Sequence, residues 1–179
     1  MLKTGEQHLD SLRDGRKVYI GDELVEDVTT HPAFRNAAQS FAMLYDRKRD
    51  ADNIDVMAYE DDDGELSTSW YLKPATRDDL RKRRETHRRV AERTCGLIAR
   101  SPDHLASFVT GLLWKPHLFE ENLKNSAGAL LDYYDYMRKN DTFACYTVLP
   151  PQGARQPELY QREGLTVPTL RVTAEDKEG

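Results

Sequence analysis

Apolar residues at helical spacing run through most of the first 140 residues. Apolar side chains three and four positions apart form one face of an amphipathic helix, so this spacing predicts helices rather than strands. Several of these segments open with a threonine or serine, which caps a helix amino terminus. The predicted helices cover residues 4–12, 34–45, 76–99 and 116–139, and a further one begins at 101–103.

Two pairs of short β-like segments predict hairpins between these helices. Val18–Ile20 and Leu24–Val25 flank Gly21-Asp22, a dipeptide that favours a tight turn. Asp55–Glu60 and Leu66–Leu72 flank an acidic, glycine-containing run that is typical of a hairpin loop. Both hairpins are small, and the fold class that we predict is mainly α with small β-hairpins.

The character of the chain changes after the last predicted helix. Residues 142–149 are β-like, 150–157 read as an irregular loop, and 169–173 form a second β-like run. Lone strands leave unpaired edges that natural proteins usually cover. We therefore predict a helical domain over residues 1–140 and the beginning of a truncated β domain over 141–179.

Composition and charge exclude several classes of protein. Hydrophobic residues make up 39% and charged residues 32%, which suits a soluble globular chain. The net charge of −5 and the pI of about 5.6 disfavour a nucleic-acid partner. No apolar run approaches the roughly 20 residues of a membrane span, and no signal peptide is apparent. We expect a cytoplasmic protein in which Cys95 and Cys145 are reduced, small core residues.

A basic stretch lies within the longest predicted helix, over residues 77–93. Such a stretch could bind phosphate or nucleic acid. Acidic residues are interleaved with the arginines, however, and that pattern is typical of ion pairs along a helix. We favour a solvated or interface helix over a nucleic-acid surface.

Residues 100–104 form a corner between two predicted helices. From such a corner Arg100 could reach inward with a fixed fork of donors that suits a carboxylate or a phenolate. His104, one turn into the next helix, could share that cavity. Alternatively, Arg100 caps the carbonyls of the preceding helix and His104 lies at the surface. Spacing alone favours this second interpretation.

A second candidate is the stretch from Tyr146 to Arg155, where a β-like strand runs into a proline-glycine loop. Gln152, the amides around Gly153, and Arg155 could bind a flavin or a phosphate, although turns of this composition are common. The sequence contains no GxSxG, P-loop, GxGxxG or HExxH motif, and its five histidines have no metal-ligand spacing. We therefore predict no metal site.

Several segments, in order, resemble the amino-terminal part of the 4-hydroxyphenylacetate 3-monooxygenase family, which includes the pyoverdine-chromophore hydroxylases. They begin with TGEQHLDSLRDGRKVYIGDELVEDVTTHPAF and LYDRKRD, and continue with YLKPATRDDLRKRRETHRRVAERTCGLIARSPDHLASFVTG, ENL, YYDYMRKND and PPQGARQPELYQ. The similarity covers essentially the whole chain. Members of the family are much longer, so this chain corresponds to their amino-terminal part.

The resemblance implies the amino-terminal helical domain of an acyl-CoA dehydrogenase-like fold, followed by the start of a β domain. It also implies a flavin-dependent monooxygenase of a two-component system. Such an enzyme hydroxylates a phenol, for example 4-hydroxyphenylacetate, at the ortho position with dioxygen. Its cofactor is FAD, used as FADH2 that a separate flavin reductase supplies.

The resemblance further implies site residues. Arg100 matches the arginine that contacts the substrate hydroxyl, where its charge would stabilise phenolate character. His104 stands where relatives often have tyrosine, and Tyr146 where they often have a histidine near substrate and flavin. Tyrosine, with an ordinary pKa of about 10, is the poorer base at neutral pH. The implied flavin contacts are Tyr146, Thr147, Val148, Gln152, Gly153, Ala154 and Arg155.

The expected partners are a phenolic small molecule, a flavin reductase, and either the missing carboxy-terminal part or further copies of the chain. We expect no nucleic-acid and no membrane partner. Because flavin binding in the family also uses the domains that are absent here, we expect this chain to be inactive alone. The alternative is a non-catalytic fragment or interaction domain that assembles with another chain.

Overall fold

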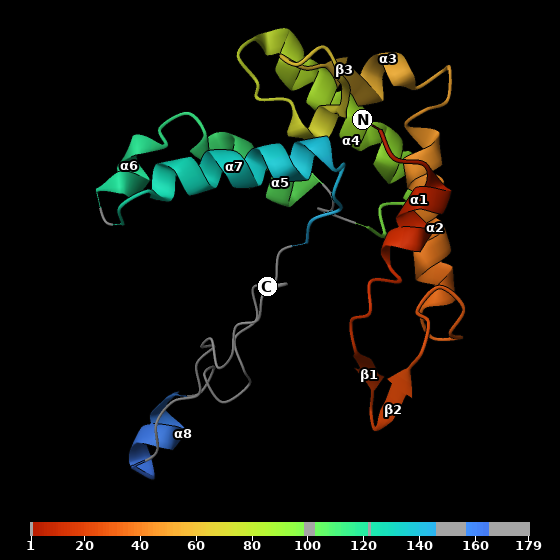
Figure 1. Cartoon of the computed structure of the whole chain (residues 1–179), viewed down its shortest axis with the longest axis vertical. Helices are drawn as coiled ribbons and strands as arrows, with labels where there is room; N and C mark the ends of the chain where they lie inside the picture. Colours follow the sequence, from red (N-terminus) through yellow and green to blue (C-terminus); the bar gives the residue numbers. More distant parts are fainter. Residues whose placement is uncertain (1, 99–102, 122, 146–156, 165–179) are drawn as a thin grey trace. The chain divides into compact units, whose positions relative to one another are not determined.

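The computed structural model describes residues 2–98, 103–121, 123–145 and 157–164 (Figure 1). The chain divides into two compact units, Met1–Cys145 and Tyr146–Gly179. In the second unit the described residues form one short helix, α8 (Pro157–Arg162). No helix of the described part is both long enough and apolar enough to cross a membrane. All other described helices and strands belong to the first unit.

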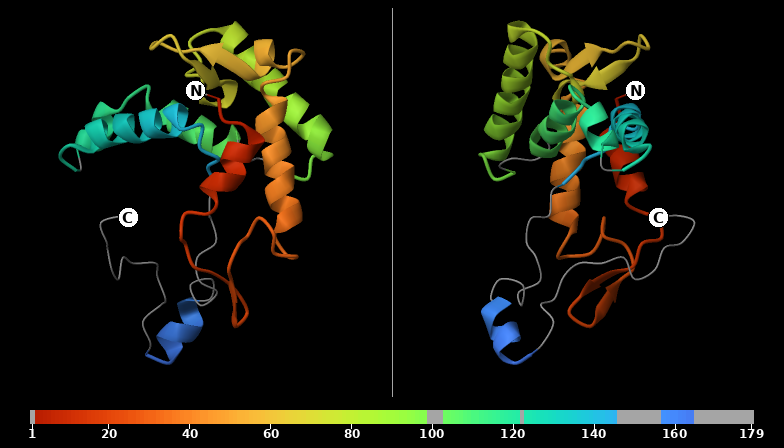
Figure 2. Two further views of the ribbon diagram at one scale, coloured as in Figure 1. Left: turned by 45° about the vertical axis from the view of Figure 1, so that its right-hand side comes forward. Right: turned by 90° about the vertical axis from the view of Figure 1, so that its left-hand side faces the viewer.

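Helices α1 (Gly5–Ser11) and α2 (Arg35–Arg47) pack side by side (Figure 1). The predicted capping box opens α1: the Thr4 hydroxyl accepts the Gln7 amide, and the Gln7 side chain accepts the Thr4 amide. The chain segment that connects the two helices forms the first predicted hairpin, β1 (Val18–Ile20) and β2 (Glu23–Val25). Figure 2 shows this hairpin projecting beyond the two helices.

The second hairpin differs in part from its prediction. Its strands are β3 (Ala58–Glu60) and β4 (Leu66–Thr68), but the residues before and after them form the helical turns α3 (Ile54–Met57) and η1 (Ser69–Tyr71). The strands predicted over 55–60 and 66–72 were therefore too long. A cause lies in α3, where the Val56 carbonyl accepts the hydroxyls of Ser69 and Thr86 instead of a strand partner.

Helix α4 (Arg77–Thr94) begins at the predicted capping box of Thr76 and Asp79. It ends before the predicted boundary at residue 99, because Cys95 and Gly96 are both left-handed, with φ values of 53° and 72°. The Gly96 amide then donates to the Ala91 carbonyl, 2.9 Å away, and closes the helix end.

The next segment contains helices α5 (Asp103–Leu112), α6 (His117–Glu120) and α7 (Ser126–Lys139). The single helix predicted over residues 116–139 is wrong, because Asn125 is left-handed, with a φ of 67°. The Glu120 carboxylate accepts the amides of Asn125 and Ala127 and so caps the new helix start.

The core lies between α2, η1, α4, α5 and α7. Its buried members are Leu44, Met57, Trp70, Tyr71, Val90, Ala106, Val109, Met137 and Ala144. The prediction that Cys95 and Cys145 are core residues is wrong, since both are exposed. Residues 142–145 form no strand, although a strand was predicted from 142; residues 146–149 and 169–173 lie outside the described residues.

Candidate functional site

One predicted site residue, His104, belongs to the described part of the chain. It lies in the first turn of α5 and is half-buried, with its ring edge-on to Phe108 at a centroid distance of 5.5 Å. The other predicted residues lie outside the described ranges; they are Arg100, Tyr146, Thr147, Val148, Gln152, Gly153, Ala154 and Arg155.

Helix α5, which carries His104, is attached to α4 through the buried guanidinium of Arg83. This group donates to the Thr110 hydroxyl at 2.9 Å, to the Ser107 hydroxyl, and to the Leu72 carbonyl at 3.3 Å. Charge-assisted hydrogen bonds of this kind are about twice as strong as neutral ones. Arg83 therefore fixes the rotation of the helix on which His104 sits.

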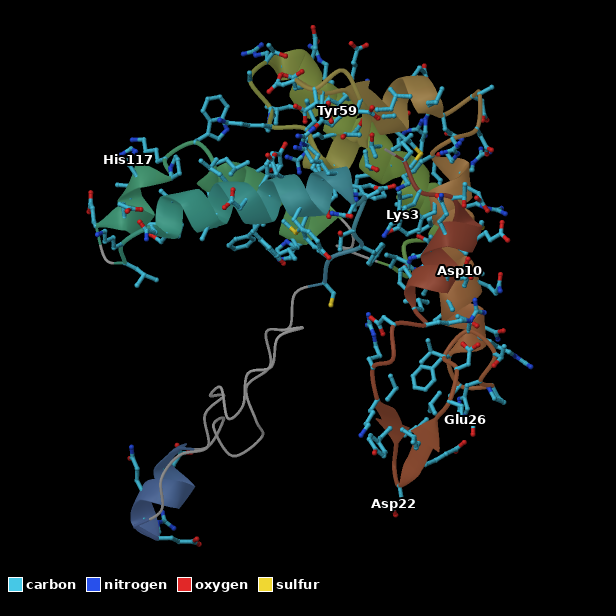
Figure 3. The ribbon with its side chains drawn as sticks, viewed as in Figure 1. Lys3, Asp10, Asp22, Glu26, Tyr59 and His117 are labelled. Carbon is cyan, nitrogen blue, oxygen red and sulfur yellow. The ribbon has the colours of Figure 1, made fainter. Side chains whose placement is uncertain are left out.

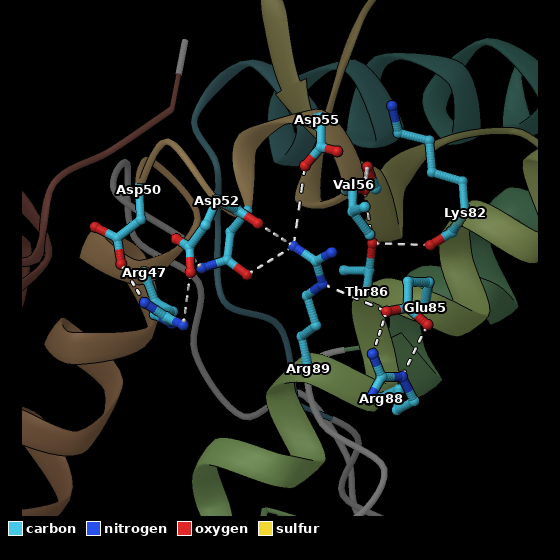
Figure 4. Close-up of polar contacts among 12 residues, drawn as sticks. Arg47, Asp50, Asp52, Asp55, Val56, Lys82, Glu85, Thr86, Arg88 and Arg89 are labelled. Atoms are coloured by element: carbon cyan, nitrogen blue, oxygen red, sulfur yellow. Dashed lines mark hydrogen bonds and ion pairs between the residues drawn. The ribbon is translucent and has the colours of Figure 1, made fainter.

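Two other arginines of α4, Arg88 and Arg89, pair with carboxylates, as the interleaving of acidic residues predicted (Figure 4). Arg88 bonds to Glu85 and Glu92, and Arg89 bonds to Glu85 and to the Asn53 side chain. The hydrogen bonds from Arg88 lower the pKa of Glu85 to about 2. The charges of Arg88 and Arg89 are thus compensated by neighbouring carboxylates on the surface of α4 and α3.

A buried ion pair, which the sequence did not predict, joins α2 to the end of α7. The Lys48 ammonium lies 2.5 Å from the Asp141 carboxylate, and the exposed fractions of the two side chains are 0% and 1%. The ammonium also donates to the Thr68 hydroxyl at 3.1 Å. It sits 4.0 Å from the Tyr45 ring centroid and 4.6 Å from that of Trp70.

Burial changes the proton affinities around this pair. It lowers the pKa of Lys48 to about 8, against the attraction of Asp141. It also lowers the pKa of His8, which stacks on Tyr45 at 4.5 Å, to about 4. The Tyr45 pKa is raised by the same burial and by Asp141. His8, Tyr45, Lys48 and Asp141 are all buried. We therefore interpret this cluster as one that stabilises the fold and not as a substrate site.

A second buried cation, Arg138, holds the hairpin loop between β3 and β4 against α7. Its guanidinium pairs with Asp61, with Asp63 at 2.9 Å, and with Asp135 at 3.3 Å. The Arg138 side chain is 7% exposed. Within the described ranges, no group of three or more histidine, cysteine or acidic side chains could hold a metal ion.

An apolar groove of about 620 Å³ opens beside α6, the helix that carries His117 in Figure 3. Trp114 on its wall is 53% exposed, and the Lys73 ammonium lies 4.5 Å from the Trp114 ring centroid. The lining residues are Gly111, Leu112, Trp114, Lys115, Leu118, Phe119, Leu123 and Ser126. Exposed apolar surface gathered in one place is typical of a surface that another polypeptide covers.

Comparison with known proteins gives one family over nearly the whole chain. Residues 4–179 match the family described as 4-hydroxyphenylacetate 3-hydroxylase N terminal. A 4-hydroxyphenylacetate 3-monooxygenase oxygenase component from Geobacillus sp. (strain PA-9) is 35% identical, over 99% of this chain and 36% of its own length. A 2,4,6-trichlorophenol monooxygenase from Cupriavidus pinatubonensis (strain JMP 134 / LMG 1197) is 31% identical, over 100% of this chain and 35% of its own length.

A solved structure matches as well. It is the oxygenase component (HpaB) of 4-hydroxyphenylacetate 3-monooxygenase, complexed with FAD and 4-hydroxyphenylacetate. Its TM-score is 0.77 at 30% sequence identity, and the match covers 86% of this chain and 31% of that one. The chain spans about a third of the length of the curated relatives it matches.

Proposed function

Because the chain belongs to the 4-hydroxyphenylacetate 3-hydroxylase N-terminal family, we propose that it is the amino-terminal portion of an FADH2-dependent aromatic hydroxylase. The reaction is the ortho-hydroxylation of a phenol with dioxygen, and a separate flavin reductase supplies the reduced flavin. The observation that carries the proposal is the match of 86% of the chain to an oxygenase that holds FAD and 4-hydroxyphenylacetate. The corresponding fold is the first part of an acyl-CoA dehydrogenase-like architecture.

In this proposal the site residues hold the phenol and shield it from water. Arg100 binds the substrate hydroxyl and stabilises its phenolate form, and His104 donates a hydrogen bond to the same substrate. Tyr146 lies next to substrate and cofactor, while Gln152–Arg155 contact the flavin. FAD supplies the oxygen chemistry when bound. The fixed rotation of α5 by Arg83 supports the role of His104, because a positioning side chain needs a rigid support.

The described residues provide one expected substrate contact, His104, and none of the expected flavin contacts. A flavin contact made by residues 152–155 alone would supply only a few hydrogen bonds, each with a net contribution of about 0.5–1.5 kcal/mol. Ordering a loop costs about 1–2 kcal/mol for each residue fixed. We therefore expect the 179-residue chain alone neither to bind FAD tightly nor to hydroxylate a phenol.

Anaerobic titration of the purified chain with FADH2, followed by admission of oxygen, tests this expectation. We expect no micromolar binding and no catechol from the chain alone. When a polypeptide that supplies the remaining two thirds of the family fold is added together with a flavin reductase, we expect micromolar flavin binding and formation of a catechol. Catechol formed by the chain alone would show that the chain needs no further polypeptide for activity. Absence of turnover after the remaining polypeptide and the reductase are added would refute the proposed function.

In the completed enzyme, Arg100→Gln should lower kcat/KM for 4-hydroxyphenylacetate about 100-fold, the loss typical of one electrostatic donor. His104→Tyr restores the residue that relatives often carry, so it should retain turnover and change the preference among phenols. Steady-state kinetics with a panel of phenols measures both effects. An unchanged kcat/KM in the Arg100→Gln enzyme would show that Arg100 does not bind the substrate hydroxyl.

A second candidate function is an interaction domain without catalysis, which the exposed apolar groove beside α6 favours. Such a domain would associate with the remainder of the family fold on another chain, or with further copies of itself. Sedimentation velocity of the chain, alone and with the completing polypeptide, separates the two functions. A tight complex without any turnover would favour the interaction domain.

A further inference from the structure

Helix α7 ends in an aspartate where most helices of this kind end in glycine. The Thr142 amide donates to the Met137 carbonyl at 3.0 Å and the Asp141 amide to the Arg138 carbonyl at 3.2 Å, which is the Schellman pattern. This pattern needs a left-handed residue, and Asp141 supplies it with a φ of 45°. Glycine adopts this conformation without strain, and aspartate is one of the few other residues found there, because its short polar side chain can hydrogen-bond locally. Unlike glycine, Asp141 also brings a carboxylate to this position.

The Asp141 carboxylate collects hydrogen bonds from three parts of the unit. It accepts the Lys3 amide at 3.0 Å, the Lys48 ammonium at 2.5 Å, and the Thr68 hydroxyl. These donors come from the segment before α1, from the residue that caps the end of α2, and from β4. A carboxylate this deeply buried is tolerated because a cation and further donors satisfy it.

The backbone that follows is held as well. The Tyr45 hydroxyl donates to the Asp141 carbonyl at 2.7 Å, and the Tyr71 hydroxyl donates to the Thr142 carbonyl. The Phe143 ring packs against Phe41, with a centroid distance of 4.4 Å. Residues 141–143 are thus fixed from several directions, immediately before the end of the first unit at Cys145.

We propose that Asp141, with Lys48 as its counter-ion, is a positioning residue that fixes residues 141–143, which closely precede the predicted site residue Tyr146 in the chain. The inference rests on the proposed function for its consequence, because Asp141 would act through Tyr146 rather than touch substrate or flavin. A merely structural ion pair would stabilise the unit without any special effect on this segment. The Arg138 cluster provides that comparison: its guanidinium is buried on the same helix but pairs with the β3–β4 loop.

The exposed Cys145 provides a probe two residues beyond the fixed segment. A nitroxide spin label on Cys145, in a Cys95→Ser background, reports the local mobility of the backbone by electron paramagnetic resonance. Asp141→Asn and Lys48→Met should each shorten the rotational correlation time of the label at least twofold. Arg138→Met, the matched control, should leave it unchanged, although it also removes a buried cation and leaves the carboxylate of Asp61 without its cationic partner.

The double variant Lys48→Met/Asp141→Asn removes the charges together and so keeps the comparison possible if a single variant fails to fold. The double variant should shorten the rotational correlation time of the label as the single variants do. An unchanged label in the double variant, or equal loosening by Arg138→Met, would overturn the positioning role.

The consequence for catalysis is measured in the enzyme completed with the remaining polypeptide and the reductase. Asp141→Asn should lower kcat about tenfold with little change in KM, and Arg138→Met should lower neither. Full kcat in Asp141→Asn would overturn the role. If the parent enzyme has no turnover, the proposed function fails, and the spin-label comparison still decides whether Asp141 fixes the segment.

Discussion

At the scale of single residues, His8 links the stability of the fold to pH. Burial, together with Lys3 and Lys48, lowers its pKa from 6.5 to about 4. Between these values the unfolded chain binds a proton that the folded chain does not, so stability rises with pH across this window. Lowering the pH from 7 to 4 should cost about 3 kcal/mol through His8 alone. Urea unfolding at intervals between pH 7 and pH 4 measures it.

His8→Phe is the matched control for this prediction, because phenylalanine keeps a ring against Tyr45 and cannot take up a proton. Other groups titrate in the same window, so the informative quantity is the difference in unfolding free energy between parent and variant. That difference should change by about 3 kcal/mol in favour of the variant as the pH falls. A constant difference would show that His8 is protonated equally in both states.

The contrast between predicted and unpredicted residues follows from sequence distance. The capping boxes at Thr4 and Thr76 were visible because their partners lie three positions away. Lys48 and Asp141 lie 93 positions apart, in segments that read as ordinary charged helix ends. Nothing local distinguishes a lysine that will be buried from one that stays in water, so this cluster emerges only from the tertiary fold.

At the scale of elements, α1 and α2 approach so closely that one position admits only glycine. A Cβ added at Gly5 would lie 2.5 Å from the Ala42 carbonyl oxygen. Gly5→Ala should therefore destabilise the unit by about 1–3 kcal/mol, as overpacking does. Gly128→Ala on α7 meets nothing within 4 Å and should be neutral or stabilising by up to about 1 kcal/mol. Thermal unfolding of the two variants tests the contrast, and equal melting temperatures would contradict it.

Helix and hairpin positions were predicted better than their boundaries. Periodicity marks where an apolar face exists, and it located both hairpins and most helices. It cannot show where a side chain diverts the backbone, as Glu120 does when it caps a new helix inside the predicted range 116–139. The turn at Ile54–Met57 likewise depends on hydroxyls from Ser69 and Thr86, which are distant in sequence.

At the scale of the whole molecule, the arrangement of charge argues against binding to polyanions. The net charge is −5, and arginines of α4 are paired with carboxylates of the same surface. We expect the chain to elute from heparin at low salt, and Arg88→Gln to elute at the same position. Retention with a steep salt dependence, of slope about −5 for six neutralised phosphates, would restore the nucleic-acid interpretation of residues 77–93.

The hydrogen bond from Lys3 to Asp141 also sets an order in time. It joins residues 138 positions apart, and a ribosome adds about 5–20 residues per second, so the amino terminus waits on the order of ten seconds for its partner. Until Asp141 emerges, Lys48 has no counter-ion and must stay hydrated, which keeps the rings of Tyr45 and Trp70 from closing over it. During synthesis the core around Tyr45 and Trp70 is therefore completed only after residue 141 has been added to the chain.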